Sequence, residues 1–135
     1  MPEITGIAHV ELSVRDLERS VTWYTRLLGA RDVWRGANER YGITACAIYE
    51  PGSRMVFAFT QHAKQEPEAF SPRRPGLDHV SFAVRDREAL EEWVRRLDEL
   101  GIEHSPIQDD HTPVSVTFSD PDGIALELSY SPRGM

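Results

Sequence analysis

A segment near the start of this chain returns 70 residues later, and this internal repeat constrains the fold more than any other feature. The run HVELSVRD at 9–16 is matched by HVSFAVRD at 79–86, and the same offset aligns Trp23 with Trp93. A match held over this length without a gap predicts two copies of one structural unit. If the copies pack about a pseudo-twofold axis, the histidines that lead them lie near each other, and we expect the chemistry there.

Each copy opens with a strand pattern followed by a helix pattern. In the first copy the residues alternate between an apolar and a polar set, which are Val10, Leu12 and Val14 against His9, Glu11 and Ser13. This period of two is typical of a half-buried strand. Asp16 then fits a helix N-cap, apolar residues recur at helical spacing as far as Leu28, and Gly29 fits the position after the helix. The second copy repeats this plan from His79 to Gly101.

The remaining patterns complete two βαβββ modules. Further strands are predicted at 31–35, 43–49 and 55–61 in the first copy, and at 102–108, 114–118 and 124–129 in the second. The strand at 102–108 is the weakest, because Pro106 limits pairing. Segment 63–76 contains three prolines and is predicted to connect the modules. We expect one α+β domain over 1–135, with module 1 at 4–62 and module 2 at 77–130, in which a curved mixed sheet surrounds a cleft and the helices lie outside.

Composition excludes several classes of function. A net charge of −7 argues against nucleic-acid binding, which needs a concentrated basic surface. No apolar run approaches the roughly 20 residues of a membrane span, and the first residues lack a signal-peptide pattern. The lone Cys46 has no intrachain partner for a disulfide and is expected to be a small buried hydrophobe. We therefore expect a globular cytoplasmic protein with a small-molecule substrate.

The polar strand faces carry a candidate metal site. Bulky apolar residues share one face of each strong strand, and the opposite face carries His9, His79 and Glu127. Two neutral imidazoles and one carboxylate hold a divalent ion on one side and leave the other positions free for water, substrate or dioxygen. The competing interpretation is three unrelated polar residues on a half-exposed sheet. The repeat favours the metal site, because both histidines occupy one topological position.

Three stretches carry a family resemblance. They are HVELSVRDLERSVTWYTRLLG at 9–29, LDHVSFAVRD at 77–86 and FSDPDGIALEL at 118–128. The combination resembles the vicinal oxygen chelate superfamily, which groups glyoxalase I, extradiol dioxygenases, fosfomycin-resistance enzymes and bleomycin-resistance proteins. The resemblance implies paired βαβββ modules, usually a homodimer, and a metal bound by first-strand histidines and a fourth-strand glutamate. His9, His79 and Glu127 match those positions.

One departure from the family pattern narrows the expected activity. In glyoxalase I the fourth strand of the first module also supplies a ligand, and the alignment places Ala58 there. Alanine cannot ligate, so three-ligand relatives remain: dioxygenases and fosfomycin-type enzymes that open an epoxide. The first would use Fe(II) and the second Mn(II), while Ni(II) and Zn(II) also suit the ligand set. The alternative is a metal-free bleomycin-resistance-type protein that binds a drug or metabolite.

Other residues are candidates for roles beside the metal. Glu11 lies on the same strand face as His9 and is interpreted as a general base or a substrate-orienting group. The competing interpretation is an exposed carboxylate on the cleft rim. His62 is predicted to lie on the same strand face as Ala58 and is interpreted as an acid or base. The competing interpretation is a loop histidine just past the strand. Trp34 fits a pocket wall or a dimer interface. Whether each cleft forms within one chain or between two chains stays open.

Two further sets of residues complete these expectations. A phosphonate substrate would need nearby cations, for which the candidates are Arg35, Arg40, Lys64, Arg73 and Arg74. The remaining histidines, His104 and His111, lie in weakly patterned segments and are expected to be exposed to solvent.

Overall fold

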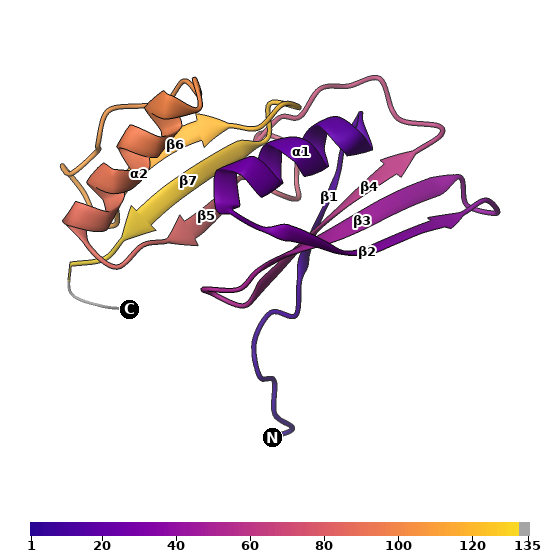
Figure 1. Ribbon diagram of the computed structural model, residues 1–135, viewed down its shortest axis with the longest axis horizontal. Helices are drawn as coiled ribbons and strands as arrows, with labels where there is room; N and C mark the ends of the chain where they lie inside the picture. The colour runs from indigo at the N-terminus through magenta and orange to yellow at the C-terminus, as the bar shows by residue number, and fades with distance from the viewer. Residues whose placement is uncertain (133–135) are drawn as a thin grey trace. The chain divides into compact units, whose positions relative to one another are not determined.

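The computed structural model describes residues 1–132 and divides the chain into two compact units. Unit 1 ends at Pro67 and unit 2 begins at Glu68. Each unit has its own sheet and one helix (Figure 1). Within the described residues, neither helix is long and apolar enough to cross a membrane.

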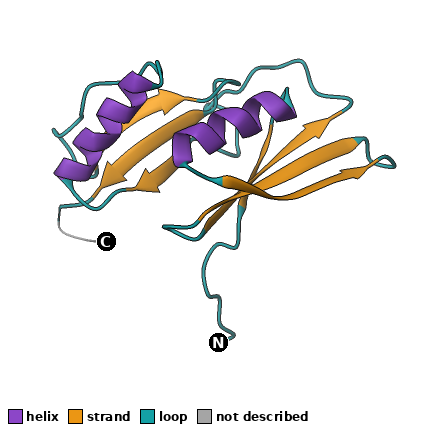
Figure 2. Cartoon of the chain, in the orientation of Figure 1, coloured by secondary structure: helices purple, strands orange, loops and turns teal. Residues whose placement is uncertain are grey.

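Unit 1 has the predicted βαβββ order. Its elements are β1 (Val10–Ser13), α1 (Leu17–Leu28), β2 (Arg31–Asn38), β3 (Ile43–Glu50) and β4 (Met55–His62). The strands form a sheet of order β1-β4-β3-β2. Strand β1 runs parallel to β4, whereas β4, β3 and β2 are antiparallel neighbours (Figure 2). The parallel contact between β1 and β4 brings the first and last strands of the unit together.

Both predicted ends of α1 are confirmed. The Asp16 carboxylate accepts a hydrogen bond of 3.1 Å from the backbone N–H of Arg19, which satisfies one of the unpaired donors of the first turn. Gly29 ends the helix in the left-handed conformation with φ of 66°. Its N–H donates to the Thr25 carbonyl, as in a helix C-terminus closed by glycine.

The core of unit 1 lies between α1 and one face of its sheet. Tyr24 of α1 is fully buried, and its ring centroid lies 4.7 Å from that of Phe59 and 5.3 Å from that of Phe57. Cys46 lies on the same side of the sheet with no exposed surface, and burial raises the pKa of its thiol. Cys46 is therefore a small core residue, as predicted, and the opposite face of the sheet is free of the helix.

Unit 2 is shorter by one strand than predicted. Its elements are β5 (Val80–Ala83), α2 (Arg87–Glu99), β6 (Val114–Ser119) and β7 (Ala125–Tyr130), and the sheet order is β5-β7-β6. The predicted strand at 102–108 is wrong. This segment makes only two isolated bridges, from His104 to Phe118 and from Gln108 to Ser115. Pro106 lies between them and has no N–H to donate, so a continuous ladder cannot form there.

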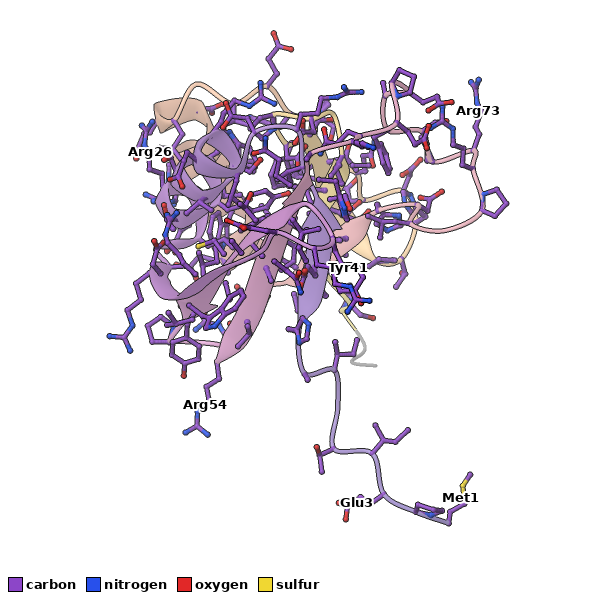
Figure 3. The ribbon with its side chains drawn as sticks, turned by 90° about the vertical axis from the view of Figure 1, so that its right-hand side faces the viewer. Met1, Glu3, Arg26, Tyr41, Arg54 and Arg73 are labelled. Atoms are coloured by element: carbon purple, nitrogen blue, oxygen red, sulfur yellow. The ribbon has the colours of Figure 1, made fainter. Side chains whose placement is uncertain are left out.

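The repeat extends further toward the N-terminus than the sequence match suggested. Gly6 and Gly76 lie three residues before the two histidines, and their φ angles are 140° and 136°. Both glycines thus adopt a conformation that L side chains rarely reach. The residues before β1 are exposed, and Met1 and Glu3 lie on a segment that extends away from the sheet of unit 1 (Figure 3).

Candidate functional site

In unit 1, His9 and Glu11 lie together on the face of the sheet opposite α1. His9 directly precedes β1, and its Nε2 lies 3.7 Å from Oε1 of Glu11. The Thr60 hydroxyl of β4 donates a short hydrogen bond to the other carboxylate oxygen, Oε2. The two side chains are 53% and 44% exposed. Glu11 is therefore held by Thr60 through Oε2, while its Oε1 lies beside the imidazole of His9.

In unit 2, His79 is oriented by the residue before it. Nδ1 of His79 lies 2.7 Å from Oδ1 of Asp78. An ionised carboxylate can only accept a hydrogen bond, so Nδ1 carries the proton. The lone pair of the neutral ring is then on Nε2, and the side chain is 44% exposed. Metal-binding histidines have this arrangement, in which a carboxylate fixes the tautomer and the ring orientation.

Glu127 is oriented by its neighbour across the sheet. Ser81 of β5 is paired with Glu127 of β7, and the Ser81 hydroxyl donates to Glu127 Oε1 over 2.9 Å. The Ser129 hydroxyl lies 2.7 Å from that of Ser81 and supplies the hydrogen bond that Ser81 accepts. Leu126 and Leu128 on either side of Glu127 are buried. Glu127 is thus on the face of β7 opposite the core, as the alternation predicted.

The candidate site carboxylate lies on the first strand of unit 1 but on the last strand of unit 2. Glu11 of β1 is paired with Ala58 of β4, and Ser81 of β5 is paired with Glu127 of β7. Because Glu11 and Ser81 are equivalent in the repeat, Ala58 occupies the position of Glu127. The register thus agrees with the alignment that placed alanine where a fourth ligand would stand. Unit 1 offers His9 and Glu11, and unit 2 offers His79 and Glu127.

The predicted metal ligands belong to different units. His9 lies in unit 1, while His79 and Glu127 lie in unit 2. Across residues 1–132, no three His, Cys, Asp or Glu side chains lie together as a metal site requires. The donor chemistry fits a divalent ion, since it combines neutral imidazoles with an oriented carboxylate. The three-ligand site remains a prediction.

His62 lies on the face of Glu11 but further along the sheet. It is the last residue of β4 and is exposed. It follows Ala58 by four residues, which is about 13 Å along a strand. Since Ala58 is the direct partner of Glu11, His62 is too far along the strand to share a hydrogen bond with Glu11. Its catalytic role stays a prediction.

Two of the candidate cations for a phosphonate have neighbours that the structure identifies, and Arg35 lies on the other face of the sheet. Arg35 pairs in register with the buried Cys46 and so faces α1, where it makes ion pairs with Glu18 and, at 2.8 Å, with Asp32. These hydrogen bonds raise the pKa of Arg35. Arg40 lies over the ring of its neighbour Tyr41 at 5.6 Å in the β2–β3 turn.

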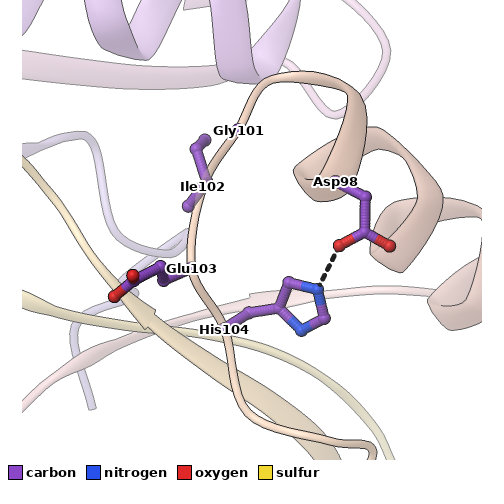
Figure 4. Close-up of a pocket in the computed structure, with 5 residues that line it drawn as sticks. All are labelled: Asp98, Gly101, Ile102, Glu103 and His104. Atoms are coloured by element: carbon purple, nitrogen blue, oxygen red, sulfur yellow. Dashed lines mark hydrogen bonds and ion pairs between the residues drawn. The ribbon is translucent and has the colours of Figure 1, made fainter.

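A second polar cluster lies at the end of α2 and was not predicted from the sequence. His104 lies beside a shallow hollow (Figure 4), and its side chain is only 15% exposed. Nδ1 lies 2.6 Å from the Ser105 carbonyl and Nε2 lies 2.7 Å from Asp98. Both partners are acceptors, so the two hydrogen bonds are made together only by the doubly protonated ring. These two hydrogen bonds, that of Ser105 first, raise the pKa of His104.

The expectation that both late histidines are exposed is half right. It is wrong for His104 and confirmed for His111, whose side chain is 57% exposed. One partner of His104 is a backbone carbonyl and the other is on a helix, and no short-range sequence pattern reports such a contact.

Comparison with known proteins identifies the family. The family model described as the Glyoxalase/Bleomycin resistance protein/Dioxygenase superfamily matches residues 6–128. MhqA of Bacillus subtilis (strain 168), named as a candidate ring-cleaving dioxygenase, is 32% identical over 96% of this chain and 40% of its own length. Metapyrocatechase of Geobacillus stearothermophilus is 28% identical over 95% of this chain and 35% of its own. The chain thus spans well under half the length of these two relatives.

Solved structures agree with this assignment. A glyoxylase/bleomycin resistance protein/dioxygenase domain from Frankia sp. EAN1pec has a TM-score of 0.84 and 32% identity, and the match covers 96% of this chain and 99% of that one. Fosfomycin resistance protein FosX of Listeria monocytogenes, in a mutant form complexed with Mn(II), has a TM-score of 0.67 and 19% identity over 94% and 93% of the two chains. At that identity the likeness concerns the fold. This chain belongs to the Glyoxalase/Bleomycin resistance protein/Dioxygenase superfamily.

Proposed function

We propose that this chain forms a divalent-metal-dependent enzyme that acts on a ring bearing adjacent oxygen atoms, in the manner of a ring-cleaving dioxygenase. His9, His79 and Glu127 would hold the ion. The observation that carries the proposal is that hydrogen bonds orient both candidate ligands in unit 2. Asp78 fixes the tautomer of His79, and the Ser81 hydroxyl donates to Glu127. Hydrogen bonds of this kind orient metal ligands and raise their basicity.

The position of Arg35 and the names of two relatives support this substrate class. A phosphonate would need clustered cations, and Arg35 is engaged by Glu18 and Asp32 on the helix side of the sheet. A ring with two hydroxyl groups needs no such cluster. The two relatives at 28% and 32% identity are named for catechol or ring cleavage, which also favours this class. The ring-cleaving reading is therefore preferred to epoxide opening.

Glu11 is proposed to accept a proton from a substrate hydroxyl. When bound, the ion would supply Lewis-acid polarisation of the substrate oxygens. Thr60 occupies Oε2 of Glu11, which leaves Oε1 as the free acceptor, and that oxygen lies 3.7 Å from the atom of His9 that would bind the ion. A hydroxyl brought to His9 would thus meet a carboxylate already in place. His62 is proposed as a second proton-handling group at the far end of β4.

Oxygen consumption tests the proposed reaction. Protein loaded with Fe(II) under anaerobic conditions, then given catechol and oxygen, should consume oxygen and open the ring. Glu127→Ala should abolish this activity while its far-ultraviolet circular dichroism stays unchanged. Catechol binding that chelators leave intact, with no oxygen uptake, would instead favour the metal-free binding protein.

A mixing experiment determines how the site is assembled if the protein is the homodimer that its family resemblance implies. His9→Ala and Glu127→Ala each lack one ligand. If a site combines His9 of one copy with His79 and Glu127 of another, a mixed dimer regains one complete site and part of the activity. If every site lies within one chain, mixing restores nothing.

A further inference from the structure

Trp34 lies on the same face of unit 1 as Glu11, in one row across the sheet. Glu11 of β1 is paired with Ala58 of β4, Ala58 with Ala47 of β3, and Ala47 with Trp34 of β2. Paired residues share a face, so this row joins the carboxylate to the indole through two methyl groups. Three strand spacings separate its ends, or about 14 Å between backbones. We call this side of the sheet, opposite α1, the His9 face.

A β-bulge brings the indole to this face. Asp32 is paired with Ile48 and Trp34 with Ala47, so the register shifts by one residue between them. Bulges of this kind redirect side chains and occur often beside functional sites. Without the shift, simple alternation would place Trp34 on the core face with Ile48. The bulge instead gives an exposed edge strand a large aromatic side chain on the His9 face.

The indole is held flat along the strand by a glycine. A Cβ atom at Gly36 would clash with the six-membered ring of Trp34, so the ring lies directly over Gly36. Trp34 is nevertheless 57% exposed. One side of the indole is thus supported by the backbone of its own strand, and the ring still presents surface to solvent. An exposed aromatic ring in a fixed orientation is a suitable surface for stacking.

We propose that Trp34 is a specificity-determining residue that stacks its indole against the ring system of a planar substrate. The inference rests on the proposed function, because the substrate's adjacent oxygens would be held at the Glu11 end of the row. The row is long enough to accommodate a substituted or two-ring aromatic compound, and the two side chains between its ends are alanines, of which Ala58 is only 6% exposed. Trp34 would thus favour extended planar diols over single rings and over non-planar diols.

Binding of three diols by the Zn(II)-loaded protein tests this role without requiring turnover. The probes are 2,3-dihydroxynaphthalene, catechol and the non-planar cis-1,2-cyclohexanediol. Trp34→Ala should weaken binding of the two-ring compound about tenfold, which is the scale of one aromatic contact together with its buried area. It should weaken catechol less and cyclohexanediol not at all, and Trp34→Phe should restore most of the loss.

Two matched variants separate stacking from a general disturbance. Gly36→Ala retains the indole but displaces it, so it should reproduce the effect of Trp34→Ala. Tyr41→Ala removes a similarly exposed aromatic residue, 66% exposed, from the β2–β3 turn and should leave all three affinities unchanged. The indole N–H signal of Trp34, assigned among the three tryptophans by Trp34→Phe, should shift on addition of the two-ring diol.

The possible failures of this inference and of the proposed function are distinguishable. Equal affinity of wild type and Trp34→Ala for the two-ring diol, with Zn(II) bound in both, would overturn the role of Trp34 alone. So would conversion of a dimer to a monomer by Trp34→Ala, which would make Trp34 an interface residue. A protein that takes up no metal but shows the Trp34 shift would refute the metal-dependent enzyme and retain the stacking surface. Neither metal uptake nor a shift would overturn both.

Discussion

At the scale of single residues, the hydroxyl of Ser81 has a defined role beside the candidate ligand Glu127. It donates to Glu127 and accepts from Ser129, so it transmits a fixed orientation to the carboxylate. Removing a partner of this kind typically costs 10- to 100-fold in metal affinity. We therefore expect Ser81→Ala to weaken Zn(II) binding by about tenfold. Calorimetric titration with Zn(II) measures this, and Thr22→Ala, at an exposed site on α1, is the control.

His104 makes the stability of unit 2 depend on pH. Its pKa is raised in the folded protein, so its stabilising effect is fully present below the unfolded pKa of about 6.5 and is lost as pH rises through the folded value. His104→Ala should lower the free energy of unfolding by about 1 kcal/mol at pH 6, with the difference shrinking toward pH 9. Urea unfolding across this pH range measures the trend, and a constant difference would contradict it.

The same cluster gives a direct spectroscopic check. Asp98→Asn removes the carboxylate but leaves the Ser105 carbonyl, so it should lower the pKa of His104 without returning it to the ordinary range. Proton NMR titration of His104 in the wild type and in Asp98→Asn measures both values. Equal values in the two proteins would contradict the contribution of Asp98.

At the scale of secondary structure elements, the two helices begin with the same device. Asp16 caps α1 through Arg19 N–H, and Asp86 caps α2 through Ala89 N–H at 3.0 Å. Replacing an N-cap aspartate by alanine costs about 1 kcal/mol. Asp16→Ala and Asp86→Ala should each lower the stability by that amount in urea unfolding. Glu3→Ala, in the exposed N-terminal segment, should change it by less than about 0.5 kcal/mol.

The elements that the sequence predicted well are those with local signals. Alternation located β1, and cap residues with helical periodicity located α1, because both patterns arise from contacts within a few residues. The strand expected at 102–108 was wrong. Pro106, which already marked it as the weakest prediction, interrupts the ladder and leaves two isolated bridges. The sequence also could not predict on which face of the sheet Trp34 lies. A one-residue bulge reverses the alternation of β2, and nothing in its sequence marks the bulge.

At the scale of the whole molecule, the repeat predicted the architecture better than it predicted the site. The first strand pairs with the last strand in the same way in both copies. Ala58 of unit 1 therefore corresponds to Glu127 of unit 2. The two copies differ in the residues at these positions. The carboxylate of unit 1 is Glu11 on β1, and that of unit 2 is Glu127 on β7. How side chains from two units combine depends on how the units or chains assemble, and a sequence pattern within one unit carries no information on that.

Metal content is the most direct test of the central claim that this chain is a metalloenzyme. Elemental analysis should compare wild type, His79→Ala and His62→Ala, all purified without a metal-affinity tag. We expect near-stoichiometric divalent metal, Fe or Mn, in wild type and in His62→Ala, and its loss in His79→Ala. Retention of the metal in His79→Ala would contradict the assigned ligands. Absence of metal from wild type, with no uptake of Fe(II), Mn(II), Ni(II) or Zn(II), would contradict the claim that the protein is a metal-dependent enzyme.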